Sequence, residues 1–408
     1  MAERQMRRRG TQALAAALVA TFVLAHAGCA SSSTPGRGSD SGVYSFWPPP
    51  PNEPRVQFLR SFSISSDVEP DQGALERIVF GKDVQALPIA KPYGIAMWED
   101  RMYVCDITNP GVVILDLEKR QTRIMTARGV EQMAQPTDIA IAPDGTKYVV
   151  DRQMGRIFVF SADDRYVTTL GGGELELVPA GIAVYGDELF VPDLEQKSVL
   201  VLDRFSGALL RSVGGPGGDE GEFVAPLGVD VADDGNLYVG DAIRGRYQCF
   251  DPNGNLMLAV GRIGDTPGSF VRPKHIAIDR ENVVFVVDAA FQNVQMFDAE
   301  GDLLMYFGGP GDFDGAMSLP AGIAVYDGAL DYFADVVHPA FEPTELVIVT
   351  NQFGRNKVSV YALGHLREGS TVADIMPQAA EFNRATAEGI DLPPATETPS
   401  VSPAAGGG

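Results

Sequence analysis

The chain has 408 residues, of which 45% are hydrophobic and 21% charged, and its formal net charge is −22. This excess of acids predicts repulsion from nucleic acids and from anionic lipid headgroups, so binding to either is disfavoured. Only three cysteines are present, which excludes a scaffold held by several disulfides, a haem-attachment motif and a paired-cysteine metal site.

Residues 1–28 have the pattern of a bacterial signal peptide: basic residues, an apolar run too short for a comfortable membrane span, and small residues before Cys29. The junction resembles the lipobox of bacterial lipoproteins, in which the cysteine is lipidated, although His26 stands where leucine is usual. Ala30, at the position after the cysteine, resembles the pattern of lipoproteins that are sorted to the outer membrane. We therefore expect lipidation at Cys29 and attachment to the outer membrane through that lipid. Simple secretion with an incidental cysteine is the alternative.

Residues 29–54 are polar and then proline-rich, which predicts a tether. The next segment, RVQFLRSFS at 55–63, reads as a β-strand that belongs to no adjacent hairpin. The segment DQGALERIVFG at 71–81 predicts a short helix or an irregular cap.

A repeat then dominates the chain. Each copy starts Pro-x-x-Ile/Val and soon reaches a strand that ends in Asp or Asn. The copies begin at Pro92, Pro136, Pro179, Pro226, Pro273 and Pro320, which lie 44, 43, 47, 47 and 47 residues apart. A period of this length built of short strands is typical of a β-propeller.

Asp-Gly and Asn-Gly turns between the strands of each copy predict antiparallel hairpins. We therefore predict an all-β fold, a six-bladed β-propeller of four-stranded antiparallel blades spanning residues 55–365. The last copy contains an insertion at 327–345 and lacks a clear fourth strand, so the N-terminal strand at 55–63 is expected to complete it and close the ring. Residues 366–408 read as a disordered tail that holds at most a short helix near 373–386.

The repeated motif resembles NHL repeats, and the glycine-rich connections GGPGGDEGEF and GGPGDFDG are similar to those of that family. More narrowly, the Trp-Pro-Pro-Pro-Pro tether and the VQFLRSFS strand resemble the six-bladed NHL lipoproteins of Gram-negative bacteria. This resemblance implies a binding or assembly role in the cell envelope. Some members are encoded beside multihaem cytochromes, so the implied partner is an envelope protein such as a multihaem cytochrome or a secretion or assembly component.

A carboxylate or amide ends the second strand of every copy. These residues are Asp106, Asp151, Asp193, Asp241, Asp288 and Asn351. A metal-binding ring is one interpretation. Repetition in all copies favours a structural one, in which each side chain accepts hydrogen bonds from the backbone of the following turn. Cys105 and Cys249 lie half a ring apart and are expected to be free and buried.

The turns that follow these residues are unexpectedly basic for so acidic a chain. With the residues that lead into the innermost strands, they predict a cationic face that receives an anionic group or an acidic protein surface, since arginine suits such groups. The candidate binding residues are Arg152, Arg156, Lys197, Arg244, Arg246, Lys274, His275 and Arg355. The alternative is that these side chains pair with neighbouring blades.

Near the expected channel mouth, most copies place glycine after the proline, whereas two carry Asp138 and Lys274-His275. One histidine cannot supply the three-histidine zinc site of peptide-amidating lyases, which are NHL propellers. No lactonase-type set of metal ligands can be assembled either. We therefore expect no catalytic residues, no metal and no cofactor. A small-molecule or glycan binder at the channel mouth is the first alternative, and a metal-dependent lyase or lactonase the second. In the insertion, Tyr332, Phe333, His338 and Phe341 either plug the channel's opposite end or anchor a partner.

Overall fold

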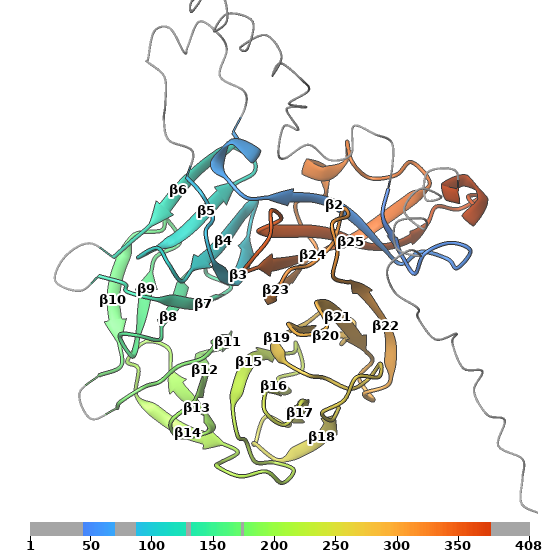
Figure 1. The fold of residues 1–408 in the computed structure, drawn as a ribbon. Coiled ribbons are helices and arrows are strands. Elements are labelled where there is room, and N and C mark those ends of the chain that lie inside the picture. Colours follow the sequence, from blue (N-terminus) through green and yellow to red (C-terminus); the bar gives the residue numbers. More distant parts are fainter. Residues whose placement is uncertain (1–43, 70–86, 128–131, 173–174, 377–408) are drawn as a thin grey trace, which may run out of the picture. The chain divides into compact units, whose positions relative to one another are not determined.

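The computed structural model describes residues 44–69, 87–127, 132–172 and 175–376, and these ranges form six antiparallel β-sheets arranged in a ring (Figure 1). The predicted signal peptide, Cys29, the first part of the tether, the cap expected at 71–81 and the tail beyond 376 lie outside the described residues. In the described part of the chain, no helix is both long enough and apolar enough to cross a bilayer.

Each of the first three blades is a four-stranded meander that runs from the channel outward. Blade one is β3 (Pro92–Trp98), β4 (Arg101–Asp106), β5 (Val112–Asp116) and β6 (Gln121–Met125); blade two is β7 (Pro136–Ile141), β8 (Lys147–Asp151), β9 (Arg156–Phe160) and β10 (Tyr166–Leu170); blade three is β11 (Ala183–Tyr185), β12 (Glu188–Asp193), β13 (Ser198–Asp203) and β14 (Leu209–Val213).

Blades four and five repeat this order, and blade six combines the two ends of the chain. Blade four is β15 (Pro226–Val231), β16 (Leu237–Asp241), β17 (Arg246–Phe250) and β18 (Leu256–Val260); blade five is β19 (Pro273–Ile278), β20 (Val284–Asp288), β21 (Asn293–Phe297) and β22 (Leu303–Gly308); blade six is β23 (Pro320–Tyr326), β24 (Phe341–Asn351), β25 (Val358–Leu366), β2 (Val56–Phe62) and β1 (Phe46–Trp47). Two 3-10 turns, η1 (Ser65–Asp67) and η2 (Leu330–Phe333), complete the elements.

The proline of each repeat stands at the start of the innermost strand in five blades, where its missing N–H costs no ladder hydrogen bond. In the ring, β23 is again a neighbour of β3, so blade two faces blade five across the axis (Figure 1). The core is a series of apolar clusters between adjacent blades. Each blade buries its faces against its two neighbours, because a single sheet cannot cover its own faces.

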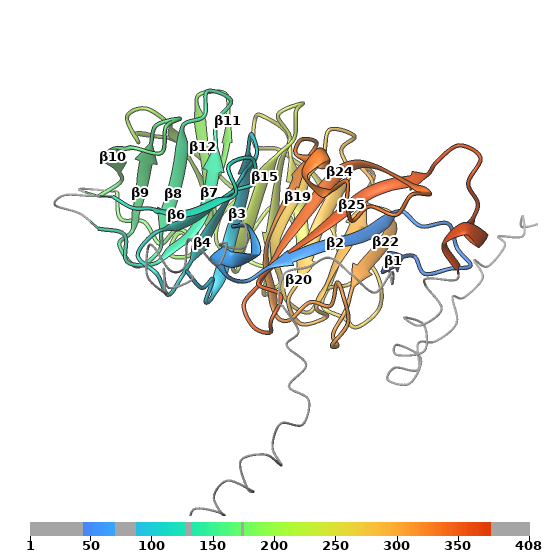
Figure 2. The ribbon, with the colours of Figure 1, turned by 90° about the horizontal axis from the view of Figure 1, so that it is seen from above.

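Closure by the N-terminal strand is confirmed. Strand β2 pairs antiparallel with β25, with Phe58 opposite Tyr361, and Figure 2 shows it along the outer edge of blade six. The tether contributes an extra strand that the sequence did not indicate, because β1 pairs with β2 and buries Phe46 and Trp47.

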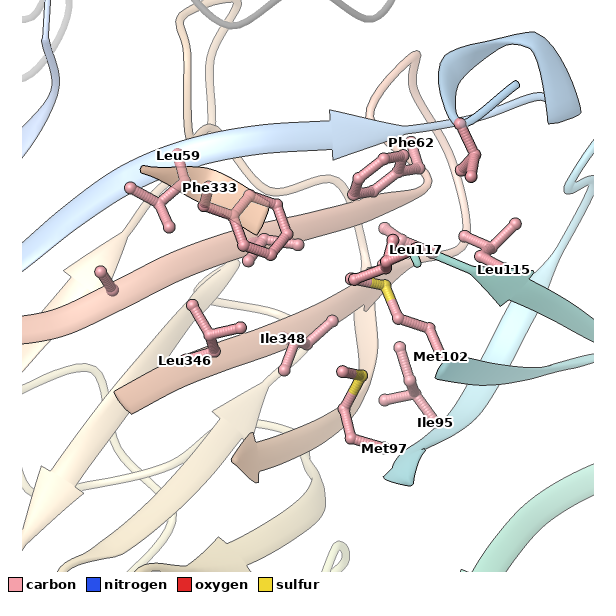
Figure 3. Packing of buried hydrophobic residues seen from close by; sticks show 14 of the residues in the cluster. Leu59, Phe62, Ile95, Met97, Met102, Leu115, Leu117, Phe333, Leu346 and Ile348 are labelled. Atoms are coloured by element: carbon pink, nitrogen blue, oxygen red, sulfur yellow. The ribbon is translucent and has the colours of Figure 1, made fainter. Parts of the chain in front are cut away.

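The seam between blades six and one is the largest of the apolar clusters (Figure 3). Phe62 of β2 and Ile348 of β24 pack there against Met102 and Leu115 of blade one. Burying a side chain of this size contributes about 1.5–3 kcal/mol, so the seam that closes the ring is also a strong stabilising contact.

The insertion at 327–345 does not plug the channel, so that prediction is wrong. Phe333 is fully buried and its ring contacts Phe62 on the outermost long strand of blade six (Figure 3). Gln57 of the same strand donates a hydrogen bond to the carbonyl of Val336 and accepts one from the backbone of His338. Phe341 is buried as well, so the aromatic residues of the insertion mainly secure the closing strand from outside.

The start of the predicted disordered tail is ordered. Strand β25 extends to Leu366, and a helical turn at 372–376 places Ile375 in the seam cluster with no exposed surface. The turn overlaps the short helix expected near 373–386, but Val372, Ile375 and Met376 are too few apolar residues to predict which surface they contact.

Candidate binding site at the channel mouth

The innermost strands approach each other so closely that most need glycine near the axis. A Cβ atom on Gly228 would lie 2.6 Å from the Cα atom of His275, and one on Gly322 would lie 2.2 Å from the carbonyl oxygen of Tyr93. Such contacts with backbone cannot be relieved by a rotamer change, which accounts for glycine at this position in four of the six copies.

In blades two and five, Asp138 and His275 occupy the glycine position, and their side chains meet across the axis. The Nε2 atom of His275 lies 3.1 Å from the Oδ2 atom of Asp138, which also accepts a hydrogen bond from the backbone of Ile182. Asp138 is 1% and His275 9% exposed. The second oxygen of Asp138 and the Nδ1 atom of His275 have no hydrogen-bond partner among the described residues.

The electrostatics of this pair follow from its surroundings. Burial alone would lower the pKa of His275, but the charge and hydrogen bond of Asp138, with help from Asp230, raise it. Burial raises the pKa of Asp230 to about 6, against hydrogen bonds from the backbone of Ile278 and Val231. The channel thus holds one imidazole between two carboxylates.

Cationic side chains surround the channel next to this pair. Lys274 is 6% exposed, donates to the Oε1 atom of Gln352 at 3.2 Å, and lies with its Nζ atom 5.3 Å from the ring centroid of Tyr93. Burial, and then the charges of Arg272 and Lys91, lower the pKa of Lys274 to about 8. Burial raises the pKa of Tyr93, while the charges of Arg152 and Asp138 act on it in opposite directions.

The carboxylates that end the second strands are structural, as expected. Asp241 is fully buried and accepts hydrogen bonds from the backbone of Val224 and Ala225, which lead into β15, and of Ile243 and Arg244 in the turn after β16. The same pattern recurs at Asp106, Asp151, Asp193 and Asp288. These bonds hold the strand lead-ins and the following turns together on one face of the ring. We name it the turn face.

The predicted binding residues divide into two groups on the turn face. Arg152, Lys197 and Arg244 are exposed and form no ion pair with any described residue. Arg355 is also exposed, although it pairs with Asp312 at 3.0 Å.

The other predicted residues are at least partly enclosed. Arg246 is 8% exposed and donates to the carbonyl oxygens of Asp219 and Glu222, so it holds its own connecting loop in place. Arg156 is partly buried and donates to the carbonyl of Gly155. Lys274 and His275 lie at the channel.

Two features of this region were not predicted from the sequence. Exposed apolar side chains share the turn face with the cations: Met154, Ile243, Ile263, Val271 and Phe353 are each 37% to 65% exposed. The meeting of Asp138 and His275 was also missed, although the signal was present. The two repeats that lack glycine at this position are three repeats apart. In a ring of six blades they therefore lie on opposite sides of the axis.

A separate cleft of about 940 Å³ lies between blades five and six. Its lining includes Met296, Tyr326, Leu363 and the acidic residues Asp279 and Glu345. Burial, with the charges of Asp279 and other acids, raises the pKa of Glu345 to about 7. In the described part of the chain, no group of three or more His, Cys, Asp or Glu side chains is arranged to hold a metal ion.

Comparison with known proteins supports the fold. The family model DUF5128, described as a 6-bladed beta-propeller, matches residues 219–307. A protein of unknown function from Bacteroides thetaiotaomicron is 14% identical, with a TM-score of 0.53 over 76% of this chain and 75% of that chain.

Two enzymes are also among the similar solved structures. A gluconolactonase from Xanthomonas campestris is 16% identical, with a TM-score of 0.50 over 67% of this chain and 86% of that chain. A virginiamycin B lyase from Staphylococcus aureus is 13% identical, with a TM-score of 0.47 over 67% of this chain and 96% of that one. At 16% identity the similarity to the gluconolactonase shows a shared fold and nothing finer.

Proposed function

We propose that this protein is a lipid-anchored, non-catalytic binding protein of the cell envelope that holds a protein partner on its turn face. The observation that carries the proposal is the mixture of side chains on that face. Arg152 and Arg244 have no acidic partner among the described residues, and they share the face with exposed Ile243 and Phe353. Exposed apolar side chains with arginine are characteristic of protein interfaces.

Charge supports an acidic partner. Other arginines pair with acids of this chain: Arg101 lies 3.1 Å from Asp116, and Arg204 lies 3.0 Å from Asp144. Arginines left without such a pair, on a chain of net charge −22, are available to carboxylates of another molecule. We therefore propose a partner whose contact surface combines acidic and apolar side chains.

The remainder of the proposal concerns location. An NHL-type lipoprotein attached through Cys29 to the outer membrane would present this face to envelope proteins, and a multihaem cytochrome or a secretion or assembly component is the proposed class of partner. A Cys29→Ser variant tests the anchor. It should leave the membrane fraction, whereas retention there would contradict lipid attachment at this residue.

The binding function is tested by in-cell crosslinking of tagged full-length protein, followed by mass spectrometry of the enriched complexes. An Arg152→Glu/Arg244→Glu variant should lose the dominant partner. Arg165→Glu is the matched control, because Arg165 is an exposed arginine in the turn between β9 and β10, on the other face of the ring. Arg246 is unsuitable, since reversing a charge that holds a loop would disturb the fold.

The result that contradicts the proposal is equal partner recovery from the Arg152→Glu/Arg244→Glu and Arg165→Glu proteins. A metal-dependent lyase or lactonase would instead show stoichiometric bound metal and turnover of lactone substrates by the purified protein.

A further inference from the structure

The ammonium group of Lys274 is unusual among the buried cations of this protein. Lys147, which is fully buried, lies 2.8 Å from the Oδ1 atom of Asp164 and also donates to the carbonyl of Ala162. Lys274 is 6% exposed, yet within the described residues no carboxylate lies within 4.0 Å of its Nζ atom. Its polar contact is the neutral amide of Gln352.

Further positive charge gathers around Lys274. Arg272 lies on the lead-in to the same strand, and Lys91 on the lead-in to β3 of blade one, with its Nζ atom 5.8 Å from the ring centroid of Phe353. Both are close enough to oppose protonation of Lys274, and they lower its pKa in addition to the effect of burial. Arg272 and Lys91 likewise have no ion pair with a described residue.

The three neighbouring cations are unfavourable in free energy unless a bound anion neutralises part of their charge. Like charges repel, and a buried ammonium without a counter-charge loses much of its hydration for one hydrogen bond. The backbone brings the three cations together from two different blades, with the Tyr93 ring beside Lys274. Asp138, held by His275, adds negative charge in the channel, so an incoming anion is expected to stay with the cations of the mouth.

We propose that Lys274, Arg272 and Lys91 form a binding site for a compact oxyanion, a carboxylate or a phosphate, at the channel mouth where blades five and one flank Gln352 and Phe353 of blade six. The oxyanion is carried by a free small molecule or by the C-terminal carboxylate of a peptide. The proposal goes beyond docking on the turn face and does not depend on it, because binding is measured on the protein without a partner.

The test is isothermal titration of the full chain in low-ionic-strength buffer with inorganic phosphate and with succinate, alongside thermal unfolding. A short peptide with a free C-terminal carboxylate and its C-terminal amide form a second pair of probes. Tight binding of the small anions identifies a free ligand. Binding of the acid peptide but not of its amide identifies a carboxylate presented by a chain.

Lys274→Met keeps the apolar stem against Tyr93 and removes the charge. It should weaken binding of whichever probe binds by about 10-fold or more, which corresponds to the loss of one charged hydrogen bond. It should also raise the melting temperature in the absence of anion, because an unpaired buried charge is gone. Lys119→Met is the control, since Lys119 is exposed in the turn between β5 and β6 and belongs to neither proposed binding surface.

Two results would overturn the proposal. One is the absence of saturable binding by every probe. The other is binding that is equally strong in the Lys274→Met and wild-type proteins, which would place the anion elsewhere. Neither result bears on the docking face, whose test uses Arg152 and Arg244.

Discussion

Asp138 of blade two and His275 of blade five join opposite sides of the ring, with 3.1 Å between Oδ2 and Nε2 across the axis. In the other four repeats this position is glycine, which has no side chain to reach across the axis. The pair therefore links blades two and five, and it contains an imidazole whose protonation changes with pH.

The free energy of unfolding should depend on pH through the contact between Asp138 and His275. The pKa of His275 in the folded protein is raised above its ordinary value of 6.5. The pair therefore contributes its full stabilisation below pH 6.5, and loses it as pH rises through the folded-state pKa. His275→Gln should cost about 1–3 kcal/mol at pH 5.5 and less at pH 9, as measured by urea unfolding. A cost that is the same at both pH values would contradict the assignment, and an Asp138→Asn/His275→Gln double variant isolates the pair energy.

The buried aspartates that end the second strands should be costly to replace. Asp241→Ala leaves four backbone N–H groups without their acceptor, so we expect a loss of about 2 kcal/mol or more in the free energy of unfolding. Asp251→Ala, at an exposed turn of the same blade, should have a smaller effect. Similar losses for the two variants would argue against the structural role.

The seam that closes the ring should be sensitive to cavities. Phe62→Ala removes a fully buried ring from the contact with Phe333, and we expect a cost of about 3–5 kcal/mol. Met257→Ala, at a side chain that is 59% exposed, should cost below about 1 kcal/mol. Denaturant midpoints compare the two, and a mild effect of Phe62→Ala would mean that the closing strand is not required.

Glu345 should destabilise the protein in alkaline solution. Its pKa in the folded protein is raised to about 7, so the stability associated with its proton is present below pH 4.5 and is lost as pH rises through 7. Glu345→Gln should therefore be more stable than wild type at pH 8, by about 1 kcal/mol after allowance for solvent screening. The advantage should vanish near pH 4. Glu342→Gln, at an exposed neighbour, is the control, and a pH-independent effect of Glu345→Gln would refute the prediction.

Much of the fold was predictable because its signals repeat. The spacing of the prolines, the Asx-Gly turns and the unpaired strand at 55–63 predicted six blades closed by the N-terminus, as observed. Contacts made by single residues were harder to predict from the sequence. The sequence does not indicate which element covers Ile375 or Phe46, because their burial depends on the distant segment that packs against each of them.

The candidate site was predictable in part. The basic turns predicted a cationic face, and Arg152, Lys197 and Arg244 are exposed there. Arg246 belongs to the same pattern but binds backbone carbonyls, since loop conformation decides which of two similar arginines faces solvent. The Lys274 cluster could not be separated from the other basic residues in the sequence, because its distinctive feature, a buried ammonium group whose polar contact is one neutral amide, depends on the fold.

The most direct test of the central claim places a photocrosslinking amino acid on each side of the molecule in living cells. Ile243 on the turn face is 57% exposed and Met257 on the outer strand β18 is 59% exposed, so Ile243→p-benzoylphenylalanine and Met257→p-benzoylphenylalanine are matched in accessibility and in blade. The account predicts one dominant envelope protein crosslinked from position 243 and absent from position 257. Crosslinking of that protein from position 257 alone, or no specific product from position 243, would contradict docking on the turn face.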